Sequence, residues 1–309
     1  MRDGSLTVQN KRLKQDHTML RLAILLLLAL GIVFVAVFGQ WLTPHDPYEQ
    51  ELKQTLAAPS GEHLLGCDRF GRDLLSRVIT GTQTTIFSAF VLVAGICVLG
   101  TLVGVIAGYA GGWLDTVLMR LSDIFLAFPE MVFAISVAGI IRGGIWAAVI
   151  AVGLIAWPRY ARIARSQVLA IKNNAYISAA KLSGCRWYQM GYRHILPNIL
   201  GPIVVTAALD IGAMIMNLAG LSFLGLGAKP PIAEWGSMMS ESRSSLQTAP
   251  WTILAPGFAV FITVLIFNLL GDTIRDILDP KQQRRRIGDG FVKIQKLVSD
   301  KRQKRRTES

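Results

Sequence analysis

The most reactive side chains in the apolar part of this sequence are a carboxylate and two methionines. Asp210 is the one charged residue between Ile195 and Gly227. A carboxylate within a membrane-spanning helix is costly and marks a transport pathway or a structural pairing. Asp210 is therefore a candidate pathway residue, with pairing to a hydroxyl or an arginine as the alternative. Met214 is a second pathway candidate: Met214 and Met216 are soft metal ligands, although methionine also fills adaptable apolar surfaces.

The remaining residue types show no pattern of a catalytic or metal site. No H-E-x-x-H sequence occurs, and the three cysteines lie far apart without the spacing of a zinc site or a disulfide framework. A G-x-x-x-x-G-K-[ST] phosphate loop is also missing from the sequence. We therefore predict no catalytic residue, no metal site and no cofactor, and the four histidines all lie outside the apolar blocks: His17, His45, His63 and His194.

The apolar residues that must position these side chains are gathered in blocks. They make up 52% of the 309 residues, and charged residues only 17%, against about 25% in a typical globular chain. A bilayer core needs about 20 apolar residues in a helix. The short fourth block reaches this length if Gly143 and Arg159 extend it. We predict an all-α polytopic membrane protein with six transmembrane helices, at residues 22–38, 84–110, 117–141, 145–157, 195–227 and 251–271.

The positive charge lies in alternate connecting segments. Lys and Arg number 7 between the fourth and fifth blocks and 12 after the sixth, but only 2 between the fifth and sixth. Cytoplasmic loops carry such an excess, so we predict that both termini are cytoplasmic and that a loop outside the cell follows the first span. Because the charge shows no basic domain or aromatic-basic platform, no nucleic-acid partner is expected.

These patterns divide the chain into five parts. The first apolar block follows basic residues, as in a signal peptide, but it is too long and lacks a cleavage site, so we predict an uncleaved span. The last part holds 11 basic and 3 acidic residues and is expected to be a solvated tail attracted to anionic lipid. The parts are a cytoplasmic segment 1–20, a transmembrane helix 21–43, an extracytoplasmic segment 44–80, a transmembrane core 81–280 with a cytoplasmic segment 159–197, and a basic cytoplasmic tail 281–309.

The cytoplasmic segment 159–197 has the pattern of two short helices joined by a turn. Small residues suit a closely packed first helix, and Gly184 allows the positive φ that ends it. Trp187 and Tyr188 begin a second, amphipathic helix, and Pro197 stands in the first turn of the next span, where its missing N–H costs little. We predict a rigid platform whose aromatic side chains enter a protein pocket; the alternative is a basic loop lying on lipid.

Two further spacings indicate contacts inside the membrane. Gly100, Gly104 and Gly108 repeat every four residues, so they share a helix face that allows another helix to approach closely; a hinge is the alternative. Arg120 and Asp123, three residues apart on one helix face, could pair with each other; a role in transport is the alternative.

The segment around Gly184 resembles a family. Ala179-Ala180, then three residues, Gly184, and Leu-Pro197 twelve residues further on is similar to the cytoplasmic motif of permease subunits of binding-protein-dependent ATP-binding-cassette importers. In that family the motif forms a coupling helix that docks on the ATPase subunit. The sequence departs at Ser178, where the family often has Glu, and at His194, where it often has Ile. The resemblance implies ATPase-coupling roles for Tyr176, Ser178, Ala179, Ala180, Gly184, Trp187, Tyr188, His194 and Pro197.

Other stretches resemble the second permease subunit of peptide and nickel importers: residues 65–77, 119–129, 221–228, 230–231, 234–236 and 267–280. The resemblance extends over roughly residues 20–282. The resemblance implies a bacterial inner-membrane protein that forms half of a translocation pathway. Its implied partners are a second homologous permease, two ATPase subunits and an extracytoplasmic substrate-binding protein, all assembled around the lipid bilayer.

The cargo expected from this resemblance is a short peptide or nickel, free or chelated. The run 209–220 is more similar to nickel-type than to peptide-type subunits. An ion-coupled secondary transporter is the alternative function, but such carriers usually contain paired internal repeats, and the sequence shows none that is convincing.

Overall fold

The computed structural model describes residues 3–278, with side chains described from Thr18 onward. The chain is helical, and within the described residues no strand forms apart from an isolated bridge between Cys67 and Asp73. The all-α prediction is therefore confirmed, whereas the predicted tail 281–309 lies outside the described residues. The helices are α1 (Asp3–Leu42), η1 (Leu52–Gln54), α2 (Leu74–Ala110), α3 (Gly112–Leu126), α4 (Glu130–Ile140), α5 (Ile145–Ile171), α6 (Ala175–Leu182), α7 (Trp187–Gln189), η2 (Met190–Ile195), α8 (Leu196–Phe223), α9 (Trp235–Glu241), η3 (Arg243–Ser245) and α10 (Trp251–Leu278).

Five of the described helices are long and apolar enough to cross a membrane, and a bent pair brings the number to six if it counts as one span. The bent pair is α3 and α4, which meet at 89°, so the continuous third span predicted at 117–141 is wrong. Pro129 explains the break, because it has no N–H to continue the hydrogen-bond ladder and disfavours helical geometry at Phe128 before it. The pair can cross the bilayer only as a broken element.

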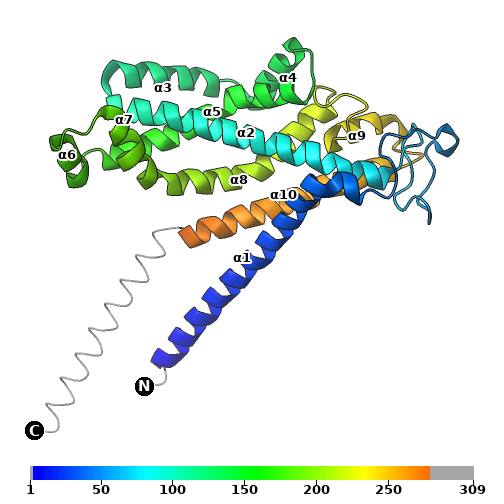
Figure 1. The fold of residues 1–309 in the computed structure, drawn as a ribbon, viewed down its shortest axis with the longest axis horizontal. Helices are drawn as coiled ribbons and strands as arrows, with labels where there is room; N and C mark the ends of the chain where they lie inside the picture. The colour runs from blue at the N-terminus through cyan, green and yellow to red at the C-terminus, as the bar shows by residue number, and fades with distance from the viewer. Residues whose placement is uncertain (1–2, 279–309) are drawn as a thin grey trace, which may run out of the picture.

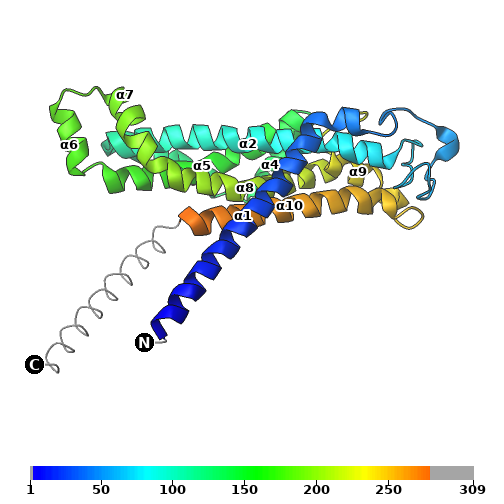
Figure 2. The same ribbon diagram turned by 60° about the horizontal axis from the view of Figure 1, so that its bottom comes forward.

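Helices α2, α5 and α8 lie lengthwise beside one another, while α1 crosses α10 obliquely (Figures 1 and 2). Large apolar side chains such as Leu27, Leu254 and Phe258 are exposed on the outer helices, as expected where the surroundings are lipid. The short helices α6 and α7 lie at one end of the bundle, and α9 lies with the loop 43–73 at the other (Figure 1). The two ends are separated by the length of the apolar bundle.

The seam between α2 and α5 is built on glycine. A Cβ added at Gly100 would lie 2.4 Å from the Trp157 carbonyl oxygen, and one at Gly104 would lie 2.2 Å from that of Ala161. At Gly108 the nearest atom would be Cβ of Val168, at 2.9 Å. The predicted glycine face therefore lies directly against another helix, and at Gly100 and Gly104 a Cβ would collide with its backbone.

Helix α5 is longer than expected. Its apolar block ends near Trp157, but the helix continues through Pro158 to Ile171. The first part of the predicted cytoplasmic segment 159–197 therefore continues the long helix α5 to Ile171. Its buried residues include Tyr160, Ala161, Ala164 and Val168, so packing against α2 carries the helix beyond the apolar block.

Candidate functional site

Helices α6, α7 and η2 form a projection at the end of the bundle opposite α9 (Figure 2); it is called the α6–η2 projection below and comprises residues 175–195. Its turn is set by Gly184, whose φ is +78°. The Gly184 N–H donates to the Lys181 carbonyl at 3.0 Å, and the Cys185 N–H donates to that of Ala180 at 3.2 Å. Open space surrounds the position of a Gly184 Cβ, so backbone conformation alone requires glycine here.

The α6–η2 projection has a buried face and an exposed aromatic face. Ile177, Met190 and Ile195 are fully buried and attach it to the bundle. Trp187 is 71% exposed and packs edge-on against Tyr188, with ring centroids 6.0 Å apart. Among the residues predicted for ATPase coupling, Ala180 and His194 are half-buried and seven are exposed: Tyr176, Ser178, Ala179, Gly184, Trp187, Tyr188 and Pro197.

A buried polar group ties together the two long helices that flank the projection. Asp210 of α8 is 4% exposed and accepts hydrogen bonds from the Tyr160 hydroxyl and from Nη1 of Arg159, both at 2.9 Å. Both donors belong to α5. The contacts are those of the structural alternative stated for Asp210. Met214, one turn further along α8, is buried, whereas Met216 is exposed.

The next two arginines of α5, Arg162 and Arg165, form ion pairs with α3. Arg165 donates two hydrogen bonds to Asp115, at 2.5 and 2.6 Å, and Arg162 donates to Asp123 at 2.6 Å. The prediction that Asp123 pairs with Arg120 three residues earlier is therefore wrong. The closer partner comes from a neighbouring helix, which no spacing within α3 could reveal.

The opposite end of the bundle holds a second charged network. Arg72 donates to Asp68 at 2.6 Å and to Glu241 of α9 at 2.9 Å. Arg77 lies 3.4 Å from the same Asp68 carboxylate. Both arginine side chains are almost fully buried, so this network joins the loop before α2 to the segment before α10.

Glu234 and Trp235 make further polar contacts at the α9 end of the bundle. Its carboxylate caps α9 by accepting from the N–H groups of Gly236 and Ser237, at 2.9 and 2.8 Å. Trp235 donates from its indole to the Val78 carbonyl at 2.9 Å. Burial raises the pKa of Glu234, although the two backbone hydrogen bonds act in the opposite direction. Residues 65–77 and 234–236 were identified by resemblance alone; in the structure Arg72 of the first stretch pairs with Glu241 of α9, and Glu234 of the second caps the same helix.

Comparison with known proteins shows which family the chain belongs to. Residues 100–284, which include the α6–η2 projection and α8 to α10, match the family described as "Binding-protein-dependent transport system inner membrane component". The chain belongs to this family. It is a multi-pass inner-membrane protein and a permease subunit of a peptide/nickel type of ATP-binding-cassette importer, not an enzyme.

Three relatives show how far the similarity extends. The dipeptide transport system permease protein of Alkalihalophilus pseudofirmus is 40% identical over 88% of this chain and 89% of its own length. The glutathione transport system permease protein of Pectobacterium atrosepticum is 39% identical over 88% of this chain and 89% of its own length. The nickel transport system permease protein of Escherichia coli K12 is 36% identical over 84% and 93%.

The fold also has a counterpart among solved structures. A chain of the MetNI methionine ABC transporter in an inward-facing conformation superposes with a TM-score of 0.55. The match covers 67% of this chain and 98% of the other, at 19% identity. At that identity the likeness shows a shared fold.

Proposed function

We propose that this permease forms half of a translocation pathway and that its α6–η2 projection docks on a partner ATPase. The observation that carries the proposal is the exposed aromatic face of the projection, held rigidly between α5 and α8. Leu182 is 90% exposed and Trp187 71% exposed. Large apolar side chains grouped on a surface mark a protein-binding site, and those at the centre of an interface provide most of the binding energy.

The remaining partners follow from the family. A second homologous permease would complete the pathway, two ATPases would bind on the cytoplasmic side, and an extracytoplasmic binding protein would deliver cargo at the α9 end. Both termini would be cytoplasmic, as the distribution of Lys and Arg indicates. Asp210 and Met214 stay candidates for the pathway wall, since both belong to α8.

The proposed cargo is a short peptide or nickel, the two classes between which the named relatives are divided. The extracytoplasmic binding protein is the place to decide, because in such systems it sets most of the selectivity. Calorimetric titration of the partner binding protein with Ni²⁺ and with di- and tripeptides would distinguish the classes, and uptake of the tighter ligand by cells carrying the transporter would link it to this chain.

The docking proposal is tested with Gly184→Asp. The substitution places a Cβ at φ +78°, which costs about 1–2 kcal/mol in local backbone strain, and adds a charge beside the aromatic face. We expect normal membrane insertion but loss of cargo-stimulated ATP hydrolysis and of uptake. The matched control is Gly61→Asp, in the loop at the opposite end, where a Cβ also meets open space.

Co-purification of the ATPase gives a second readout. Gly184→Asp should reduce the amount of ATPase recovered with the chain, and Gly61→Asp should not. Unchanged recovery and uptake in Gly184→Asp would contradict docking through the α6–η2 projection.

A further inference from the structure

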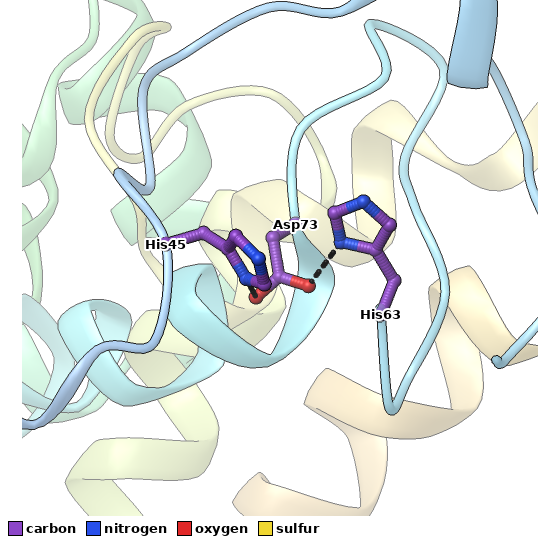
Figure 3. Close-up of side chains that lie close together, drawn as sticks. All are labelled: His45, His63 and Asp73. Carbon is purple, nitrogen blue, oxygen red and sulfur yellow. Dashed lines mark hydrogen bonds and ion pairs between the residues drawn. The ribbon is translucent and has the colours of Figure 1, made fainter. Parts of the chain in front are cut away.

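Two histidines and an aspartate meet where the first long helix, the following loop and α2 come together. His45 follows the end of α1, His63 lies in the loop, and Asp73 is the N-cap of α2 (Figure 3). One ligand atom from each residue lies within 4.8 Å of the other two. His63 and Asp73 are 10 positions apart, and the folding of the loop brings both of them to His45.

The geometry of the three side chains is that of a partial coordination shell. Nδ1 of His63 lies 2.9 Å from Oδ1 of Asp73, and Nδ1 of His45 lies 3.9 Å from Oδ2. Ligand atoms at 2.0–2.2 Å from a tetrahedral metal ion are about 3.3 Å apart. The two observed separations lie on either side of this value, so small side-chain movements would bring both imidazoles and the carboxylate onto one ion.

The polar atoms of the histidines are incompletely satisfied by protein. Nδ1 of His45, which faces the Asp73 carboxylate, is buried and has no hydrogen-bond partner among the described residues. Nε2 of His63 also has no partner there, but it lies on the side of the ring away from Asp73 (Figure 3), so only Nδ1 of His63 can be a ligand of the cluster. The separation of 3.9 Å between Nδ1 of His45 and the carboxylate is too long for a hydrogen bond. Buried polar atoms without partners are uncommon and call for an unseen ion or water.

The backbone holds the three residues in place. The His45 N–H donates to Oγ of Ser76 at 3.2 Å, and the Ser76 N–H donates to Oδ2 of Asp73 at 2.8 Å. Side-chain exposure is 39% for His45, 10% for His63 and 2% for Asp73. The carboxylate is thus fixed inside, and the outer imidazole gives an ion a route from solvent.

We propose that His45, His63 and Asp73 bind a divalent first-row transition-metal ion such as Zn²⁺ or Ni²⁺ at the outer end of the bundle. Imidazole suits Zn²⁺, Cu²⁺ and Ni²⁺, whereas Mg²⁺ and Ca²⁺ prefer oxygen ligands. Two imidazoles and one carboxylate leave a coordination position for water, as in three-ligand zinc sites. The bound ion would tie the end of α1 to the start of α2 through the loop. This site is independent of the cargo, because it would act equally in a peptide transporter.

The test is calorimetric titration of the full-length chain in detergent, purified through a tag that contains no histidine and stripped of metal with a chelator. Zn²⁺ and Ni²⁺ should bind at one ion per chain, and Mg²⁺ should not bind. His45→Ala and His63→Ala should each weaken binding at least about 10-fold, since even residues that only support a ligand contribute 10- to 100-fold. Asp46→Asn, next to His45 and outside the cluster, is the matched control.

A spectroscopic readout guards against misfolding of the His63→Ala variant. Co²⁺ bound by the wild-type chain should give a visible absorption band that is lost in His45→Ala, the substitution at the most exposed of the three residues. Zn²⁺ binding that is absent from the wild-type chain, or equally tight in His45→Ala and Asp46→Asn, would overturn the proposal and leave the cluster as a hydrogen-bonded joint.

Discussion

Replacing Gly104 by alanine measures how closely α2 and α5 approach. The added Cβ would lie 2.2 Å from the Ala161 carbonyl oxygen, 2.7 Å from Cβ of Ala164 and 2.9 Å from the Arg165 nitrogen. Two of these atoms are backbone, so relief requires the helices to separate. Overpacking of this kind costs about 1–3 kcal/mol, against a gain of about 1 kcal/mol from the better helix propensity of alanine. We expect the upper part of that range, because all three contacts are too short.

The assay is thermal unfolding of the detergent-solubilised chain. A net loss of about 1–2 kcal/mol corresponds to a fall in Tm of roughly 2–8 °C for a chain of this size class. Gly95→Ala on the same helix is the control, because its Cβ meets nothing within 4 Å, and it should leave Tm unchanged or slightly raised. Equal Tm values for the two variants would refute the close approach of α2 and α5 at Gly104.

Three further outcomes follow from the polar contacts. Asp210→Ala should lower the free energy of unfolding by about 2–3 kcal/mol, since it removes the acceptor of the buried Tyr160 hydroxyl. Asp210→Asn should cost less than half as much. If Asp210→Asn is stable but loses uptake, Asp210 has a role in the pathway. Burial raises the pKa of Glu234 above its ordinary value of 4.5, so its stabilising effect is full below about pH 4.5 and declines as pH rises through the folded pKa. The Tm of the wild type minus that of Glu234→Gln should therefore fall as the pH is raised above 4.5, and a difference that does not change with pH would contradict the raised pKa. Burial, followed by neighbouring carboxylates, raises the pKa of the Cys67 thiol to about 11. A maleimide at neutral pH should therefore label the half-buried Cys185 first, and Cys67 only on unfolding. Equal labelling rates of the two cysteines would contradict the burial of Cys67.

The helices were predictable from the sequence where a long run of apolar residues decides the structure. The first, second, fourth and sixth blocks all lie within helices of the structure, and the fifth extends four residues past the end of α8 at Phe223. The bend at Pro129 was not predicted, because hydropathy averages across a proline. The extension of α5 to Ile171 was not predicted, because the repeated charges after Arg159 indicate the end of an apolar span; the buried residues Tyr160, Ala161 and Ala164, which pack beyond it, give no such signal in the sequence.

The candidate sites were predictable only where the sequence signal is local. The turn at Gly184 depends on one residue's φ and on its near neighbours, so its motif could be read directly. Partners from separate helices could not be foreseen. Arg72 and Glu241 are 169 positions apart, and His45 meets Asp73 only because the intervening loop folds back. Such pairs are determined by tertiary packing, for which one sequence contains no direct signal.

The contacts of Asp210 between α5 and α8 have a mechanical consequence. At 1.5 Å per residue, the 27 residues of α5 make a rod about 40 Å long, and the Asp210 contacts bind that rod to α8 part-way along it. A sideways push of about 3 Å at the end that carries the α6–η2 projection would then tilt both rods together by about 4°. The pair would work as a single lever, in which a short stroke delivered at one membrane surface is converted into motion at the other.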